Sequence, residues 1–195
     1  MEFQQVAISA TTDGLTSLPN ARSLFLHLDA ELAHCRETNS ELAVLVCDLD
    51  GFKQVNDRFG HLVGNKVLRT VAAGLKERCR GHDYVARMGG DEFVLVLPGL
   101  QVGQLHEKLF ALEKVVVEAG MVVCGERLLN ISIGAVFCPE NGTDAEGLLA
   151  EADRRMYLVK QDRKKALPPA ANDLANLAAS IGNSTAAAPH SSLVQ

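Results

Sequence analysis

Two adjacent glycines separate two strand-like apolar runs near the middle of this chain, and they constrain its fold more than any other feature. Gly89-Gly90 stands between the runs at 84–86 and 93–97. A Gly-Gly dipeptide in this setting predicts a β-hairpin, because glycine adopts positive φ without steric cost. It also lets a ligand approach the backbone closely. Asp91 and Glu92 follow directly, so the turn either holds a divalent cation or carries two solvated surface acids.

The composition bounds the class of protein. Its 195 residues suit one domain with extensions, and 47% apolar with 22% charged residues is typical of a soluble globular chain. The net charge of −5 argues against a binder of nucleic-acid polymers, which usually carries a basic excess. No apolar run approaches the roughly 20 residues that span a bilayer, and the N-terminus lacks a signal-peptide pattern. The 5 scattered cysteines form no C-x-x-C pair, so we expect free thiols and a cytoplasmic location.

Hydrophobic periodicity predicts alternating helices and strands. Asn20 can cap a helix in which Leu24, Leu28 and Leu32 share one face. The expected order is that helix, a buried strand over 42–49, a compact polar segment over 51–60, a helix over 64–79, the hairpin, a helix over 102–118, strands over 121–124 and 128–137, and a helix that starts at Thr143 or Asp144. This order predicts an α/β chain built as an α+β sandwich, with a central, mostly antiparallel sheet flanked by helices in β-α-β-β-α-β order.

Changes in composition divide the chain into three parts. Residues 1–10 form a lead-in, residues 11–165 form the folded domain, and residues 166–195 are rich in Ala, Ser and Pro. The last part has little charge and few large apolar side chains, so we expect a flexible tail, in which residues 174–181 could form a short helix. The lead-in is too short for a sensor domain, so we expect either a stand-alone domain or a piece of a longer protein.

A second acidic cluster follows the first predicted strand. Asp48 and Asp50 stand at its carboxyl end, where an apolar strand can direct carboxylates into a cleft. Oxygen ligands from Asp48, from the carbonyl of Leu49 and from the two hairpin acids would suit Mg²⁺. Lys53 adds a point charge for phosphates. A calcium loop that begins at Asp48 is excluded, because its twelfth position is Phe59 and not glutamate.

Five ordered motifs make the chain resemble the GGDEF domain, the catalytic domain of diguanylate cyclases. The family's opening D-x-L-T-G-L-P-N is matched by Asp13–Asn20, and its D-x-D-x-F-K-x-x-N-D is matched by Asp48–Asp57, with Phe59–Gly64 after it. The signature is matched by Arg87–Phe93. The closing S-x-G is matched by Ser132–Gly134, and the closing A-D-x-x-M/L-Y-x-x-K is matched by Ala152–Lys160. The resemblance covers residues 11–165, which would make this part the GGDEF catalytic domain.

The resemblance implies a fold similar to adenylyl cyclases and polymerase palms, and a specific reaction. Two GTP molecules are condensed into cyclic di-GMP with release of pyrophosphate. Each domain holds one nucleotide, so the active form is a homodimer in which the 3′-hydroxyl held by one domain attacks the α-phosphate held by the other. The chemistry implies two Mg²⁺ ions in each half-site, for which Mn²⁺ can substitute.

The matched positions imply roles for individual residues. Asp48, the Leu49 carbonyl, Asp91 and Glu92 correspond to the metal ligands. Asp91, Glu92 and Lys53 correspond to the catalytic residues, and Asp91 is expected to help deprotonate the attacking hydroxyl. The positions that correspond to substrate contacts are Phe52, Asn56, His61, Asn65, Gly89, Gly90, Lys160 and Lys164.

Some of these roles stay open on the sequence alone. Asn56 is expected to hydrogen-bond the base, whereas His61 either supports that pocket or is purely structural. Lys160 is expected to offset phosphate charge. Lys164 belongs to the basic cluster 163–165, which stands where the family often has Gly-Arg, so which of its side chains contacts phosphate is not fixed.

Asn65 departs from the family pattern, which usually has aspartate at this position to bind guanine. A carboxylate only accepts hydrogen bonds, whereas an amide both donates and accepts and can therefore also pair with adenine. The hypothesis is that Asn65 loosens base selection, so that ATP is used as well and cyclic GMP-AMP or mixed products form. The alternative is that Asn56 maintains ordinary GTP specificity.

Arg80 and Asp83 stand at the spacing of the family's R-x-x-D inhibitory site ahead of the signature. There cyclic di-GMP, the product, would bind as an inhibitor, with the arginine gripping guanine or phosphate and the aspartate accepting from a guanine edge. We expect Arg80→Ala to weaken product inhibition. The alternative is that these two residues form only a surface ion pair.

Two further functions remain possible for such a chain. One is a domain that binds GTP or cyclic di-GMP without catalysis, against which the intact acids of the signature and Asp48 argue. The other is a structural or partner-binding module, which would have no use for the polar motifs.

Overall fold

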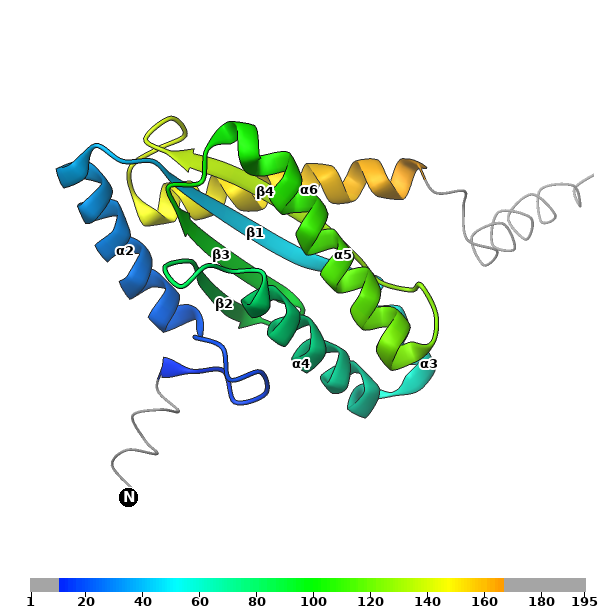
Figure 1. The fold of residues 1–195 in the computed structure, drawn as a ribbon. Helices are drawn as coiled ribbons and strands as arrows, with labels where there is room; N and C mark the ends of the chain where they lie inside the picture. Colours follow the sequence, from blue (N-terminus) through cyan, green and yellow to red (C-terminus); the bar gives the residue numbers. More distant parts are fainter. Residues whose placement is uncertain (1–10, 167–195) are drawn as a thin grey trace, which may run out of the picture. The chain divides into compact units, whose positions relative to one another are not determined.

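The computed structural model describes residues 11–166 of the chain (Figure 1). The chain divides into two compact units, Met1–Lys160 and Gln161–Gln195. In the second unit only residues 161–166 are described, and they form the end of the last helix. The predicted lead-in over 1–10, the predicted tail after residue 166 and its short helix lie outside the described residues.

Apart from the strand predicted over 121–124, the described elements follow one another in the order that the periodicity predicts. They are α2 (Ala21–Thr38), β1 (Leu42–Asp50), α3 (Phe52–Phe59), α4 (His61–Glu77), β2 (Tyr84–Gly89), β3 (Glu92–Pro98), the 3₁₀ turn η1 (Val102–Gln104), α5 (Leu105–Cys124), β4 (Asn130–Cys138) and α6 (Ala145–Ala166). The strands and the helices between them give the expected β-α-β-β-α-β layout.

The four described strands form one sheet in the order β2-β3-β1-β4, and every neighbouring pair is antiparallel. β1 lies in the middle and is buried along nearly its whole length. Its side chains alternate between two cores, with Ala43, Leu45 and Cys47 packed against α3, α4 and α5, and Val44 and Val46 packed against α2 and α6. A strand covered on both faces reads as a continuous apolar run, which is why the segment shows no polar alternation.

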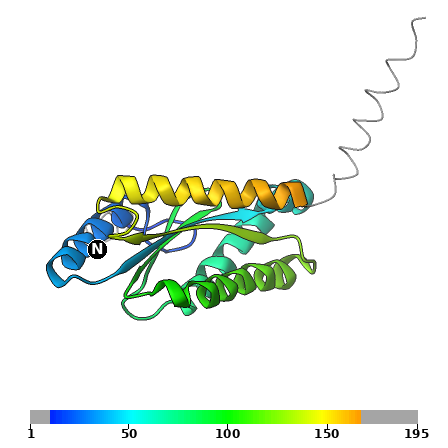
Figure 2. The same ribbon diagram turned by 90° about the horizontal axis from the view of Figure 1, so that it is seen from above.

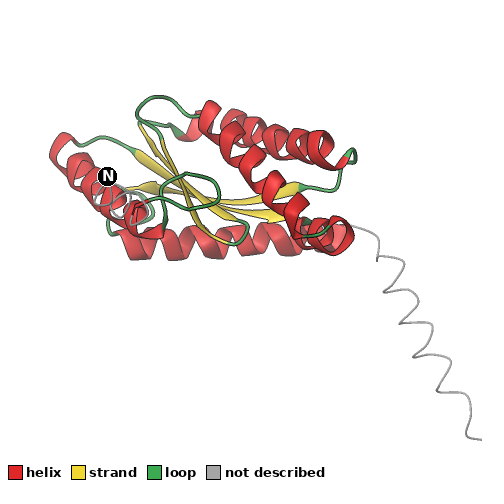
Figure 3. Ribbon diagram, turned by 90° about the horizontal axis from the view of Figure 1, so that it is seen from below, coloured by secondary structure: helices red, strands yellow, loops and turns green. Residues whose placement is uncertain are grey.

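Helices therefore cover both faces of the sheet. Figure 2 shows α6 along one face and α4 and α5 along the other, and Figure 3 shows the strands enclosed between the two helical layers. This is the expected central antiparallel sheet flanked by helices. No helix within residues 11–166 is long and apolar enough to cross a bilayer.

Two helices begin at the predicted capping residues. The side chain of Asn20 accepts a hydrogen bond from the backbone N–H of Ser23 at 3.1 Å, and that of Asp144 accepts one from Gly147 at 2.7 Å. Each satisfies an N–H group that has no partner within its helix. The second cap fixes the start of α6 just after the strand that precedes it.

The predicted strand over 121–124 is wrong, because these residues form the last turn of α5. Gly125 takes a left-handed conformation with φ of 75° and its N–H bonds to the carbonyl of Met121, so the helix ends here. The apolar side chains of this turn resemble a short strand in sequence. The segment over 51–60, predicted only as compact and polar, contains α3, and α4 begins at His61 and not at residue 64.

Gly134 sets how closely α6 approaches the sheet. A side chain at this position would collide with the backbone carbonyl of Ala152 and the backbone nitrogen of Met156. The backbone of α6 therefore lies directly on β4, which only glycine permits. This close packing positions the residue that follows Met156 by one turn of the same helix, which is Lys160.

Candidate functional site

The four acids singled out by the sequence come from two adjacent strands. Asp48 and Asp50 end β1, and Asp48 is the cross-strand partner of Glu92 on β3. Asp91 occupies the hairpin turn just before β3, and its carbonyl accepts from the N–H of Leu49 at 3.3 Å. We call these four residues the acid edge. The predicted metal ligands are thus neighbours in space, although some forty positions separate them in sequence.

Lys160 contacts the acid edge directly. Its ammonium donates to Oδ1 of Asp48 at 2.5 Å, and the two side chains are 29% and 10% exposed. The contact follows from helical geometry, since Ala152, Met156 and Lys160 are spaced by four residues and share one face of α6. Ala152 and Met156 are buried against the sheet. Lys160 therefore continues the buried face of α6 at the point where β1 ends.

Ser132 positions another carboxylate of the acid edge. It is fully buried on β4, opposite Asp48, and its hydroxyl donates to Oδ2 of Asp50 at 2.7 Å. The sequence identified Ser132 only as part of a closing motif and predicted no role for it. Its burial and its short hydrogen bond indicate that it fixes the direction of the Asp50 side chain.

Burial and nearby negative charges raise the pKa values of the two hairpin acids. The pKa of Asp91 is raised by burial and by the negative charge of Asp48. The pKa of Glu92 is raised by burial and then by Asp48, Asp153 and Asp91. Lys160 opposes both shifts. Accumulated negative charge with a partial counter-charge is the electrostatic character of a cation site.

The acid edge fits Mg²⁺ in a particular way. Among residues 11–166, no three His, Cys, Asp or Glu side chains converge into a ready-made metal cage. Mg²⁺ seldom uses such a cage, because it keeps several waters and is bound through one or two carboxylates together with substrate phosphates. Asp48, the Leu49 carbonyl and the two hairpin acids supply hard oxygen donors of this kind, so the residues present fit the group.

A sharp turn connects β1 to α3, where Phe52 and Lys53 follow the acids of β1. Gly51 has φ of 86°, and a side chain there would collide with the carbonyl of Leu128. Phe52 is then buried in the core, whereas Lys53 is exposed beside the end of β1. Phe52 therefore supports the turn from within, and Lys53 presents its charge to solvent.

The turn between α3 and α4 brings together the residues that were predicted to read the base. Asn56 lies on α3, and His61 and Asn65 lie on the first turns of α4. A side chain at Gly64 would collide with Oδ1 of Asn56, so the glycine leaves room for that amide. Asn56 and Asn65 are partly buried, and His61 is exposed. Because His61 is exposed, its predicted contribution to a base-binding pocket stays a prediction.

The signature turn is held by a network that the sequence reasoning missed. Nε and Nη2 of Arg87 donate to the carbonyl of Gly90 at 3.1 and 2.6 Å, and Nη1 donates to Asp13 at 2.8 Å. The same oxygen of Asp13 accepts from the backbone and the hydroxyl of Thr16. Both residues belong to segments that match the family's motifs, but nothing in their separation of 74 positions predicts a contact.

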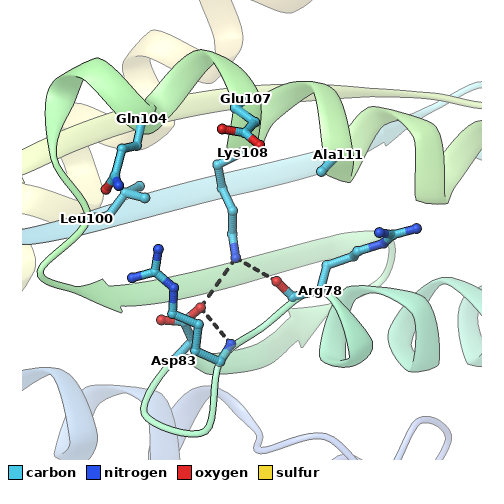
Figure 4. Close-up of a pocket in the computed structure, with 8 residues that line it drawn as sticks. Arg78, Asp83, Leu100, Gln104, Glu107, Lys108 and Ala111 are labelled. Carbon is cyan, nitrogen blue, oxygen red and sulfur yellow. Dashed lines mark hydrogen bonds and ion pairs between the residues drawn. The ribbon is translucent and has the colours of Figure 1, made fainter.

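The predicted inhibitory residues border a separate pocket of about 210 Å³, drawn in Figure 4. The carboxylate of Asp83 accepts from the backbone N–H of Arg80 at 2.9 Å and from Nζ of Lys108 at 3.3 Å. Lys108 also donates to the carbonyl of Arg78 at 2.8 Å. The Asp83 side chain is 3% exposed, whereas Arg80 is exposed. Asp83 therefore orders the loop between α4 and β2. Of the two predicted inhibitory residues, Arg80 is the one whose side chain is accessible to a ligand.

Lys164 belongs to the second unit of the chain, so its predicted phosphate contact stays a prediction. The 5 cysteines are all free, as the sequence predicts. Burial raises the pKa of several of these thiols, which keeps them neutral and unreactive.

Comparison with known proteins gives a consistent result. The family model described as "Diguanylate cyclase, GGDEF domain" matches residues 10–166. The chain is 35% identical over 152 residues to the diguanylate cyclase DgcP of Pseudomonas aeruginosa, a match that covers 78% of this chain and 23% of DgcP. It is 32% identical over 162 residues to the cyclic di-GMP phosphodiesterase PdeR of Escherichia coli, covering 81% of this chain and 24% of PdeR. The chain thus spans less than a quarter of either curated relative.

A solved structure shares the fold. The coiled coil and GGDEF domain of DgcB from Caulobacter crescentus, in complex with cyclic di-GMP, aligns with a TM-score of 0.70 at 28% identity and covers 83% of this chain and 86% of that chain. The family match extends over most of the sequence and includes every motif of the acid edge. The chain belongs to the GGDEF domain family of diguanylate cyclases.

Proposed function

We propose that this chain condenses two molecules of GTP into cyclic di-GMP and releases pyrophosphate. The observation that carries the proposal is the acid edge, in which Asp48 is the cross-strand neighbour of Glu92, with Asp91 in the adjoining turn. A module that only binds nucleotide has no need for a site in which burial and the charge of Asp48 raise the pKa values of both Asp91 and Glu92. This arrangement of acids favours catalysis over passive binding.

The residues of the site can divide the work of phosphoryl transfer, which is mostly positioning and neutralisation of charge. Bound Mg²⁺ would supply electrophilic polarisation of the phosphate and of the attacking oxygen. Asp48, the Leu49 carbonyl, Asp91 and Glu92 would hold it. Asp91 has a raised pKa, which suits a group that accepts a proton from the 3′-hydroxyl. Lys53 and Lys160 would offset the charge of the triphosphate.

The hairpin and the α3–α4 turn would position the nucleotide. Gly89 and Gly90 have φ of 154° and 51° and no atoms in the way of a side chain, so the backbone of the turn is open to a close-lying ligand. Asn56 and Asn65 would face the base. Because Asn65 is an amide where the family usually has a carboxylate, it can donate as well as accept, which supports relaxed selection between guanine and adenine as a second candidate outcome. Ordinary GTP specificity maintained by Asn56 is the alternative.

Catalysis would require two copies of the chain. Each copy offers one acid edge and one base-reading turn, whereas the reaction joins two nucleotides. The attacking hydroxyl and the attacked phosphate would therefore sit on different domains that meet face to face. The DgcB structure contains a coiled coil beside its GGDEF domain, and a coiled coil in general joins two or more helices.

The pocket at Arg80 supports a regulatory role for the product. Cyclic di-GMP carries two phosphates and two guanines, both of which a guanidinium can contact in a fork. Arg80 is exposed at the edge of this pocket, and Arg78 and Lys108 add positive charge. In this proposal Asp83 acts mainly through the loop that it orders, since its side chain is only 3% exposed and its Oδ2 accepts from the backbone N–H of Arg80 and from Lys108.

A product profile tests the proposed reaction. The chain is incubated with Mg²⁺ and GTP, ATP or both, and products are separated by chromatography, with Asp91→Asn as the inactive control. We expect cyclic di-GMP from GTP, and formation of cyclic GMP-AMP from the mixture would establish the second candidate. No cyclic dinucleotide at high protein concentration, with binding of cyclic di-GMP retained, would instead assign a non-catalytic binding module.

The phosphodiesterase relative does not argue for hydrolysis by this chain. The match covers 24% of PdeR, so the activity in that name can reside in the part of PdeR that this chain does not match. The same assay started from cyclic di-GMP measures hydrolysis directly. We expect the dinucleotide to remain intact.

A further inference from the structure

Lys160 stands where a bound cation would be expected. Its ammonium contacts Asp48 at 2.5 Å and interacts electrostatically with Asp50, Asp91 and Glu92, so it faces every carboxylate of the acid edge. The Asp48 side chain is only 10% exposed, and an unpaired carboxylate in such a place is costly. Lys160 thus compensates the charge of the acid edge.

Other basic groups near the acid edge cannot take this place. Arg87 also interacts with Asp91, but its three guanidinium nitrogens are bonded to Asp13 and to the carbonyl of Gly90. Lys53 is exposed on α3. Lys160, by contrast, has a flexible four-carbon stem on a helix whose position is fixed by packing at Gly134, so its ammonium can move while its backbone stays in place.

We propose that Lys160 is an internal counter-ion that occupies Asp48 until a divalent cation and a triphosphate arrive, and then moves from Asp48 to the phosphates. The inference rests on the proposed function, because it takes the acid edge to be the metal site of that reaction. Asp48 cannot hold a metal ion on the same oxygen that accepts from the ammonium. The two cations therefore compete for Oδ1 of Asp48 when no nucleotide is present.

Competition of this kind couples metal binding to nucleotide binding. The metal ion alone must displace Lys160 into water, whereas the triphosphate offers the displaced ammonium a new anionic partner. Each ligand then strengthens the binding of the other, and the coupling is reciprocal. Lys160 would make the metal site weak in the empty domain and strong only when substrate is bound.

Replacement of Lys160 by methionine tests this directly, since it keeps an unbranched side chain that is only one atom shorter and removes the charge. Binding of Mn²⁺ without nucleotide is measured from the electron paramagnetic resonance signal of the free ion. We expect Lys160→Met to bind Mn²⁺ about tenfold more tightly than the unmodified chain, which is the scale of one partly buried charge contact. A non-hydrolysable GTP analogue should tighten Mn²⁺ binding strongly in the unmodified chain and much less in the variant.

Two further variants serve as controls. Lys114 on α5 is exposed and pairs with Glu118, so Lys114→Met removes the same charge away from the acid edge and should leave Mn²⁺ affinity unchanged. Lys160→Arg keeps the charge and should retain weak binding. Equal Mn²⁺ affinity in Lys160→Met and the unmodified chain would overturn the inference.

Thermal unfolding provides a second measurement that holds even where Lys160→Met folds poorly. In EDTA the variant should melt at a lower temperature than the unmodified chain, because Asp48 loses its partner, and Mn²⁺ should restore it more than it stabilises the unmodified chain. No such restoration would count against the inference. Turnover of GTP separates the proposed function from the counter-ion proposal. If the unmodified chain forms cyclic di-GMP but Lys160→Met binds Mn²⁺ with unchanged affinity, the proposed function stands and the counter-ion proposal is refuted.

Discussion

Asp13 links two segments that lie far apart in the sequence. One of its oxygens accepts from Thr16, in its own loop, and from Arg87, which in turn holds the carbonyl of Gly90 in the signature turn. Burial alone would raise the pKa of Asp13, but the hydrogen bonds from Thr16 and Arg87 outweigh it, and the net pKa is lowered. A single carboxylate therefore fixes both the loop at 12–19 and the turn that carries Asp91.

We expect Asp13→Asn to lower the free energy of unfolding by about 1–3 kcal/mol at neutral pH, because the acceptor for Arg87 and Thr16 loses its negative charge and the ion pair with Arg87 is lost. The contribution of a carboxyl group with a lowered pKa is complete above its ordinary value, about 3.9, and disappears as pH falls through the lowered pKa. Urea unfolding should therefore show a constant difference between the two proteins from neutral pH to about 5 and a shrinking difference below about 4. A difference that persists unchanged in acid would contradict this.

At the scale of residues, the sequence predicted those features that depend on neighbouring positions in the chain. The caps at Asn20 and Asp144 and the acids at the end of β1 follow from nearest-neighbour patterns. The contacts of Asp13 with Arg87 and of Lys160 with Asp48 join positions 74 and 112 apart. No local pattern encodes such pairs, because the sheet register and the packing of α6 create them.

At the scale of elements, the packing of α6 on β4 determines where Lys160 lies. We expect Gly134→Ala to destabilise the domain by about 1–3 kcal/mol, because the added carbon collides with the backbone of α6, which must shift as a body. Chemical denaturation measures the loss. Gly103→Ala is the matched control, since a side chain there meets no heavy atom within 4 Å, and it should change stability by less than about 0.5 kcal/mol. Similar values for the two variants would show that α6 can yield without cost.

The elements themselves were largely predictable from hydrophobic periodicity, and the failure at 121–124 has a physical cause. Met121 to Cys124 is an apolar tetrad next to a glycine, which is equally typical of a strand before a turn and of a helix before its cap. The distinction depends on the preceding three turns of α5, whose buried side chains carry the helix through to Gly125. Tertiary packing decides this case, and short-range pattern does not.

For the whole molecule, the proposed reaction needs two copies, and the rate should report this. We expect the initial rate of cyclic di-GMP formation per chain to rise with protein concentration and to level off where dimers predominate, because the two reacting nucleotides are held by different copies. Measurement of initial rates over a dilution series at saturating GTP tests it. A specific rate that is independent of concentration down to high dilution would indicate a permanently assembled enzyme or a reaction within one copy.

The loop at 12–19 also closes one edge of the sheet. β2 is an outer strand, and the backbone N–H of Arg87 that points away from the sheet donates to the carbonyl of Pro19 at 2.9 Å. Uncovered strand edges recruit strands from other molecules and lead to aggregation. Deletion of this loop would therefore expose a strand edge that can pair with other molecules, and it would also loosen the signature turn. A truncation that begins near α2 would yield a protein that precipitates, and its lost activity would then say nothing about the acids themselves.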